Sequence, residues 1–207
     1  MSVYRQKDYI LLKLHECQEK FIKLQEIYEF DDQKSPVNLT LELLEEDFPV
    51  KDGSKKYQQR VSSLKNSCDA LPMHVVLVNK NFMTQMKETE IEIVGHCRLL
   101  CVAGKSNMTF IDDFVIRKQY RAQGFGRYLF KSLEEFLKLE LDQDSFGIAS
   151  KTEIDRSFFR HMGMNKLDDG QKIPYIDVQE GQLLNKLNKF FSGRIQKTIF
   201  PSNNGHF

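Results

Sequence analysis

The sequence lacks several features that define common classes of protein. No apolar run approaches the ~18 residues that a membrane-spanning helix needs. The first apolar patch is broken by lysine and histidine and has no small-residue cleavage site after it, so no secretory signal is expected. Lys and Arg number 30 against 29 Asp and Glu, which argues against a protein that coats nucleic acid. We therefore expect a cytoplasmic protein that partners neither a membrane nor a nucleic acid.

Metal-binding patterns are also missing. The four cysteines, Cys17, Cys68, Cys97 and Cys101, do not show the paired spacing of zinc sites. Reduced thiols and no metal are the expectation. With 207 residues, the chain is long enough for one well-cored domain with some residues left over.

The most informative segment runs from Thr109 to Lys138 and reads TFIDDFVIRKQYRAQGFGRYLFKSLEEFLK. Its first part is rich in β-branched and aromatic residues, which predicts a strand. Its last part repeats apolar residues at three- and four-residue steps, which predicts an amphipathic helix. Between them lies the sequence Arg121-Ala-Gln-Gly124-Phe-Gly126. Free backbone N–H groups at a helix start favour an anionic phosphate, and glycines let a ligand approach the backbone closely.

Two familiar phosphate loops do not fit this segment. A P-loop needs a lysine and a hydroxyl residue directly after its second glycine, and neither follows Gly126. A dinucleotide-binding fingerprint needs a third glycine where Leu129 stands. The pattern that remains is Arg/Gln-x-x-Gly-x-Gly/Ala between a strand and a helix.

The rest of the chain predicts alternating elements. Helices are expected over 7–30, 57–64 and 154–161, and strands over 38–44, 74–78, 90–102, 145–149 and 172–178. Gly95 within the long strand suggests a bulge or a close backbone approach. We divide the chain into an N-terminal helical extension (1–36), a main domain (37–180) and a C-terminal tail (181–207). The first helix either packs on its own domain or binds a partner.

The loop pattern in this context resembles the pyrophosphate-binding signature of the GCN5-related N-acetyltransferases (GNAT). This resemblance implies an α/β (α+β) fold with a central mixed, mostly antiparallel sheet flanked by helices, here with an extra N-terminal helix. It also implies acetyl-CoA as the cosubstrate. The residues that it assigns to acetyl-CoA are Phe114, Val115, Ile116, Arg117, Arg121, Ala122, Gln123, Gly124, Phe125, Gly126, Arg127, Thr152 and Phe159.

Three segments indicate one subfamily within this family: SSLKNSCDALPMHVVLV (62–78), IVGHCRL (93–99) and RAQGFGRYL (121–129). Together they look like the animal acetyltransferases of the mature actin N-terminus. This likeness implies transfer to the α-amine of an acidic N-terminus, most of all processed actin, with profilin as a candidate additional partner. A basic mouth suits such a peptide. The residues expected to form it are Arg60, Arg117, Lys118 and Arg121.

The chain departs from that subfamily in three ways. Gln123 replaces a second arginine, and the tryptophan expected near Lys55 is missing because the chain contains none. Phe159 stands where a tyrosine would protonate the departing thiolate, and phenylalanine cannot donate a proton. Tyr175 is considered as a substitute acid, although a packed strand aromatic is the simpler interpretation.

The remaining catalytic candidates lie on the predicted strands. Asp112 is the favoured general base because it aligns with an acid in the resembling subfamily. His96, acting through water, is the second candidate, and its alternative is an ordinary core histidine. A backbone N–H near Phe114 or Val115 would polarise the acyl oxygen.

Two other functions stay open. The chain could acetylate lysines or small amines, or it could be a non-catalytic GNAT-fold binding module that uses the first helix to hold a partner. Phe159 keeps the second of these open. The intact phosphate loop argues against it, because a module without activity does not need a cofactor cradle.

Overall fold

The computed structural model describes residues 6–26, 31–80, 91–102, 105–143, 145–150, 153–166, 175–177, 182–183 and 197–201. The chain divides into two compact units, residues 1–98 with 113–133, and residues 99–112 with 134–207. Strands β3 (Ile93–Val102) and β4 (Lys105–Ile116) and helix α5 (Phe125–Leu139) run from one unit into the other. Among the described residues, no helix has the length and apolar character needed to cross a membrane.

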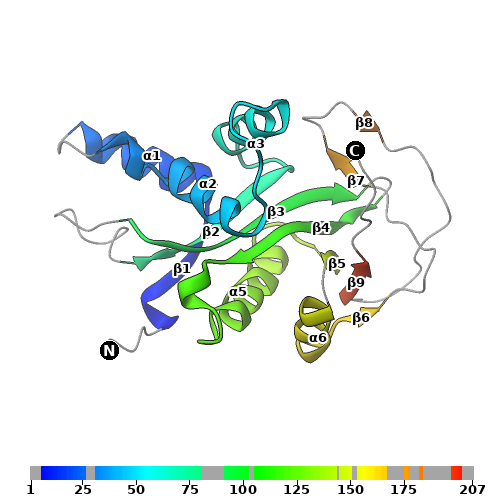
Figure 1. The fold of residues 1–207 in the computed structure, drawn as a ribbon. Helices are drawn as coiled ribbons and strands as arrows, with labels where there is room; N and C mark the ends of the chain where they lie inside the picture. The colour runs from blue at the N-terminus through cyan, green and yellow to red at the C-terminus, as the bar shows by residue number, and fades with distance from the viewer. Residues whose placement is uncertain are drawn as a thin grey trace. The chain divides into compact units, whose positions relative to one another are not determined.

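The first unit combines helices with one side of a sheet. Its strand order is β1-β2-β3-β4, and β1 runs antiparallel to β2 with Tyr9 opposite Asn79. Helices α1, α2 and α3 lie on one side of these strands and α5 lies on the other (Figure 1). The bounds of these elements are β1 (Tyr9–Lys13), α1 (Leu14–Gln25), α2 (Pro36–Asp47), α3 (Lys55–Lys65) and β2 (Met73–Asn79). Three 3-10 turns lie at Gln6–Asp8, Asp32–Lys34 and Lys118–Tyr120.

The core of this unit forms between the first three helices and the sheet. Its buried apolar side chains come from every one of these elements and include Leu14, Phe21, Leu43, Leu64, Val76 and Val115. On the other face of the sheet, a Cβ at Gly95 would lie 2.9 Å from Ile116 Cδ1 and 3.1 Å from Leu129 Cδ2. Side chains of β4 and α5 therefore occupy the space that a Cβ would need, and the absence of a side chain at Gly95 lets Leu129 of α5 pack closely on β3. The predicted bulge or close backbone approach stays a prediction.

The second unit contains the other part of the sheet and helix α6 (Glu153–His161). Its strand order is β4-β5-β9-β6, where β5 (Ser145–Ser150) is parallel to both β4 and β9 (Lys197–Pro201), and β6 (Asn165–Lys166) is parallel to β9. Strand β7 (Tyr175–Asp177) is antiparallel to β3 and to β8 (Gln182–Leu183). The mixed sheet flanked by helices, predicted from the sequence, is confirmed.

Most of the predicted elements are present, and two predictions are wrong. The segment 7–30 is not one helix, because it begins with a 3-10 turn and β1 before α1 starts. The strand expected over 38–44 is helix α2, which Pro36 opens at its first turn while the Ser35 hydroxyl accepts the Asn38 N–H at 3.3 Å. Parts of the segments 90–102 and 172–178 lie outside the described residues. The domain boundaries at residues 36 and 180 stay predictions.

Candidate active site

The predicted phosphate loop lies between β4 and α5. After the 3-10 turn, Ala122 and Gly124 take left-handed conformations with φ of 57° and 84°. The Tyr128 N–H donates to the Gly124 carbonyl at 3.0 Å, which is the first hydrogen bond of α5. The N–H groups of Phe125, Gly126 and Arg127 therefore have no acceptor inside the helix. They form the end of the helix that attracts an anion.

An N-terminal residue reaches this loop, which the sequence did not predict. Gln6 donates from Nε2 to the Gln123 carbonyl at 2.7 Å. A Cβ on Gly124 would lie only 2.4 Å from the same Nε2. The left-handed backbone favours glycine here, and a Cβ would require the end of the flexible Gln6 side chain to move.

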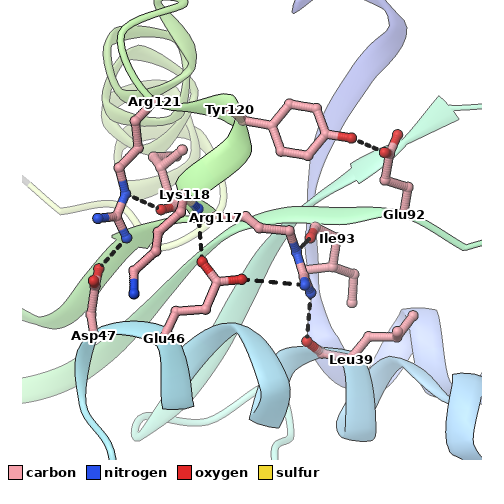
Figure 2. Close-up of polar contacts among 10 residues, drawn as sticks. Leu39, Glu46, Asp47, Glu92, Ile93, Arg117, Lys118, Tyr120 and Arg121 are labelled. Atoms are coloured by element: carbon pink, nitrogen blue, oxygen red, sulfur yellow. Dashed lines mark hydrogen bonds and ion pairs between the residues drawn. The ribbon is translucent and has the colours of Figure 1, made fainter.

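Arg117, predicted to bind both acetyl-CoA and substrate, is engaged inside the protein. Its Nε donates to the Ile93 carbonyl at 3.1 Å and its Nη2 to the Leu39 carbonyl at 3.2 Å. Its Nη1 lies 3.4 Å from the Glu46 carboxylate. Figure 2 shows this guanidinium spanning from β3 to α2. Arg117 thus joins the sheet to α2, and its charge is already balanced.

The other two predicted arginines are paired in the same way. Arg121 lies 2.5 Å from Asp47 and donates from Nε to the Ile116 carbonyl at 2.7 Å (Figure 2). Arg60 lies 2.5 Å from Glu45. Three consecutive acids at the end of α2 therefore neutralise the three arginines that were expected to attract an acidic peptide.

Two cations near the loop remain exposed. The backbone N–H of Lys118 donates to Glu46 at 2.7 Å, while its side chain extends towards α2 (Figure 2). Arg127 is exposed in the first turn of α5. No ion pair is recorded for either side chain among the residues that the structure describes. Of the predicted mouth, Lys118 is the residue that keeps an available charge.

His96 lies in the core and is not exposed at all. Its Nε2 is 2.9 Å from Nδ1 of His74, and Nε2 of His74 is 2.7 Å from the Ser63 hydroxyl. Burial lowers the pKa of His96 to about 3. A base with so low a pKa is a poor proton acceptor at neutral pH. A direct role in deprotonation stays a prediction that the geometry does not favour, and Ser63 and His74 are partners that sequence reasoning missed.

Strand β4 is irregular where the reacting groups were predicted. Asp113 has a φ of 50°, which a residue with a Cβ adopts at a cost of about 1 kcal/mol. Asp112 and Phe114 flank it and are half-buried, whereas Val115 is buried. An irregular strand turns its backbone groups away from the sheet ladder, as a site for an acyl oxygen requires.

The structure describes the three remaining predicted site residues only in part. Phe159 is buried in α6, with its ring edge-to-face against Phe158 at 5.1 Å between centroids. Thr152 lies outside the described residues, and Tyr175 lies in β7, where only the backbone is described. Their roles stay predictions.

The carboxylate of Glu92, directly before β3, accepts hydrogen bonds from two tyrosines. The hydroxyl groups of Tyr9 and Tyr120 each donate to a different oxygen of Glu92. Both rings also pack edge-to-face on Phe125, at 5.2 and 5.3 Å. Through these contacts, Tyr9 of β1 and Phe125 of α5 both pack against Tyr120, the residue directly before Arg121. No local pattern predicts this cluster, because Tyr9, Glu92 and Tyr120 lie far apart along the chain.

One group of potential metal ligands comes together among the described residues: His15, Glu16 and Asp69. The Lys13 ammonium lies 2.5 Å from Asp69 and 3.7 Å from Glu16. A resident cationic side chain already supplies the positive charge there, so we assign no metal. A surface hollow of about 340 Å³ on α3 is lined by residues outside every predicted site, namely Tyr57, Gln58, Val61, Ser62, Lys65 and Asn66.

The loop before α5 places backbone N–H groups at a helix start, where an anionic group can bind. Comparison with known families agrees: the model of the acetyltransferase (GNAT) family matches residues 38–164. The match covers more than half of the chain, so the protein belongs to this family. It is accordingly an acetyltransferase, and enzymes of this fold use acetyl-CoA.

Solved structures share the fold at low sequence identity. An acetyltransferase from Streptococcus agalactiae is 14% identical with a TM-score of 0.52, covering 83% of this chain and 92% of the other. An integron cassette protein from V. cholerae is 13% identical with a TM-score of 0.51, covering 86% and 99%. An acetyltransferase from Trypanosoma brucei is 16% identical with a TM-score of 0.50, covering 80% and 98%. At these identities the likeness concerns the fold alone.

Proposed function

We propose that this acetyltransferase transfers the acetyl group of acetyl-CoA to the α-amine of an acidic protein N-terminus, with processed actin in the cytoplasm as the first candidate and profilin as an additional partner. The loop of residues 121–126 carries the acetyl-CoA part of this proposal, since its glycine lies beside free helix N–H groups. The substrate part rests on the resemblance of three segments, 62–78, 93–99 and 121–129, to acetyltransferases of the actin N-terminus.

The reaction needs a neutral amine and a polarised carbonyl. An α-amine has an ordinary pKa near ~8, so a weak base is sufficient at neutral pH. We assign this base to Asp112, directly or through water. The N–H of Phe114 or Val115 would stabilise the charge that develops on the acyl oxygen as the amine nitrogen attacks. The departing thiolate would take its proton from water, because Phe159 offers none.

In this proposal, Lys118 rather than the arginines recognises the acidic side chains of the peptide. Arg60, Arg117 and Arg121 are held by carboxylates of α2. A guanidinium that is already paired attracts a second carboxylate weakly, since the two acids repel each other. The exposed side chain of Lys118 is the best placed of the predicted residues for the first acidic side chain of a peptide.

The internal pairing of the arginines also favours a second candidate. A mouth whose arginines are neutralised would accept an amine without acidic neighbours, such as a lysine side chain or a small amine. The non-catalytic alternative requires that no amine is acetylated at all.

Charge reversal at one lysine separates these candidates. Acetyl transfer would be measured for two peptides that differ only in starting with Asp-Asp-Glu or with uncharged residues. We expect the acidic peptide to be preferred and Lys118→Glu to reduce that preference several-fold, because an attraction becomes a repulsion. The matched control is Lys138→Glu at the exposed end of α5. Equal turnover of both peptides by the wild type would instead support the second candidate.

A further inference from the structure

The segment before β1 lies against the phosphate loop. Gln6 opens the 3-10 turn Gln6–Asp8, and its side-chain amide donates to the Gln123 carbonyl at 2.7 Å, although 117 residues separate the two. Farther along the same segment, the Tyr9 carbonyl accepts a hydrogen bond from the Tyr128 hydroxyl at 2.8 Å. The segment therefore contacts the loop at Gln123 and the first turn of α5 at Tyr128. All of these residues belong to the first unit.

Tyr9 anchors this segment. It is 3% exposed, its hydroxyl donates to Glu92, and it pairs with β2 opposite Asn79. Its ring also packs edge-to-face on Phe125, with 5.2 Å between the centroids. Because Tyr9 is held by the sheet, by a carboxylate and by α5, the chain directly before it starts from a fixed point. Gln6 therefore reaches the loop from an anchored backbone.

The loop is in an unfavourable backbone conformation where Gln6 meets it. Gln123 lies between Ala122 and Gly124, which have left-handed φ values of 57° and 84°. Ala122 carries a Cβ, so this conformation is unfavourable unless the surroundings hold it. Among the described residues, the hydrogen bond recorded for the Gln123 carbonyl is the one from Gln6. The orientation of the peptide group between Gln123 and Gly124 therefore depends on Gln6.

This peptide group carries a donor on its other side. In a trans peptide the C=O and the N–H point in opposite directions, so a carbonyl held by Gln6 leaves the Gly124 N–H on the opposite side of the group. Gly124 is exposed, and no acceptor for its N–H is recorded within the described part of the chain. The next residue is Phe125, whose N–H is the first of the free donors at the start of α5. Such a run of donors is a site for an anionic group.

We propose that Gln6 is a positioning residue for acetyl-CoA. It holds the Gln123 carbonyl, so that the Gly124 N–H stays free to donate to a phosphate oxygen of the cosubstrate. This inference rests on the proposed function, which assigns acetyl-CoA to the phosphate loop. Gln6 acts through the loop and does not touch the cosubstrate. A donor that already has its bound orientation loses less freedom on binding, so the effect is on affinity.

Calorimetric titration with CoA tests the proposal without any turnover. We expect Gln6→Ala to weaken CoA binding about three- to tenfold, the factor that corresponds to the loss of one hydrogen bond. Gln6→Glu keeps the shape of the side chain but has no proton to donate at neutral pH, so it should weaken binding at least as much. The matched control is Gln58→Ala, because the Gln58 amide donates at 3.4 Å to the carbonyl of Gly53, another left-handed glycine. This control should bind CoA as the wild type does.

Relaxation of backbone 15N nuclei tests the effect on the loop in protein without a ligand. In the wild type, we expect the Gly124 N–H to be as rigid as the backbone of α5, with an order parameter of about 0.85. Gln6→Ala should lower this value, whereas Gln58→Ala should not. Equal order parameters in the wild type and in Gln6→Ala would contradict the proposal, since Gln6 would then not be holding the peptide group.

Steady-state kinetics distinguish positioning of the cosubstrate from a general effect on the fold. Gln6→Ala should raise the KM for acetyl-CoA by about the same factor as it weakens CoA binding. It should leave kcat at saturating acetyl-CoA unchanged, because no reacting group is altered. A lower kcat with an unchanged KM would rule out the proposed role. The KM of Gln6→Ala is also the reference for any variant that combines it with a change at Gly124.

The outcomes separate this proposal from the proposed function. A wild type that binds no CoA would overturn the acetyl-CoA part of the proposed function and, with it, any role of Gln6 in binding. A wild type that binds CoA, with equal affinities for Gln6→Ala and Gln58→Ala, would overturn the positioning role alone. Tighter binding by Gln6→Ala would also overturn it, because Gln6 would then occupy space that the cosubstrate needs.

Discussion

Arg121 and Asp47 form an ion pair with 2.5 Å between Nη2 and Oδ2. Arg121 is the first residue of the phosphate loop, and Asp47 is the last residue of α2. The pair places a negative charge next to the loop that we propose to receive acetyl-CoA. We therefore expect the backbone N–H groups of the loop to contribute more to binding than the arginine charge.

Removal of this negative charge should improve acetyl-CoA binding. Asp47→Asn frees the Arg121 guanidinium, which the Ile116 carbonyl still holds through Nε at 2.7 Å. Exposed pairs are worth about 0.2–1 kcal/mol, so we expect the KM for acetyl-CoA to fall by up to about fivefold at low salt. The control is Asp52→Asn in the exposed loop before α3. A rise in KM would show that Asp47 is needed to place the arginine.

The glycine of the loop gives a test with an internal control. Gly124 and Gly53 both have left-handed φ values, of 84° and 70°, but a Cβ at Gly53 would meet nothing within 4 Å. Each change to alanine should cost about 1 kcal/mol of unfolding free energy. Only Gly124→Ala should also raise the KM for acetyl-CoA, because its Cβ would stand beside the helix N–H groups that we propose to receive the cosubstrate.

The Gln6 contact can be isolated in a double variant. Gly124→Ala combined with Gln6→Ala removes the steric conflict and keeps the backbone strain. Recovery of stability without recovery of KM would assign the glycine to cosubstrate approach. Equal KM values for Gly124→Ala and the wild type would contradict the assignment of the loop.

The Glu92 cluster should matter for stability. Glu92→Gln replaces two hydrogen bonds to a carboxylate by weaker ones to a neutral amide. Bonds to charged groups contribute about 1.5–3 kcal/mol each, so a loss on the order of 1–3 kcal/mol is expected in urea unfolding. Glu19→Gln on the exposed face of α1 is the matched control. Equal unfolding midpoints for the two variants would rule out a stabilising role for the cluster.

The buried histidines make stability depend on pH. Folding lowers the pKa of His96 from 6.5 to about 3, so the unfolded chain binds protons first as the pH falls. Stability is therefore full above about pH 6.5 and declines between 6.5 and 3. We expect His96 alone to cost about 2 kcal/mol at pH 5 relative to pH 7. Unfolding of His96→Gln across this range should show a shallower decline, and an unchanged slope would contradict the burial argument.

Local sequence patterns predicted the elements that bear the loop. The apolar repeat after Gly124 and the β-branched run before Arg117 each have a single interpretation, and both are confirmed. Helix α2 was missed because Leu39, Leu41 and Leu43 alternate as they would in a strand. The serine cap and the proline at its start were the better signal.

Long-range pairing could not be predicted in the same way. The carboxylates that bind Arg117 and Arg121 lie 71 and 74 residues earlier in the chain. Nothing in local periodicity indicates which acid will meet which arginine once the helix packs on the sheet. The contact between His74 and His96 could not be predicted for the same reason, since these residues lie on neighbouring strands but 22 residues apart.

Mass spectrometry of acetyl transfer to three peptides in one mixture tests the proposed activity most directly. One begins with Asp-Asp-Glu, one begins with uncharged residues, and one has a blocked N-terminus and an internal lysine. We expect acetyl-CoA-dependent acetylation of the first peptide at its α-amine, faster than that of the other two. Preferential modification of the lysine, or no modification of any peptide despite bound acetyl-CoA, would contradict it.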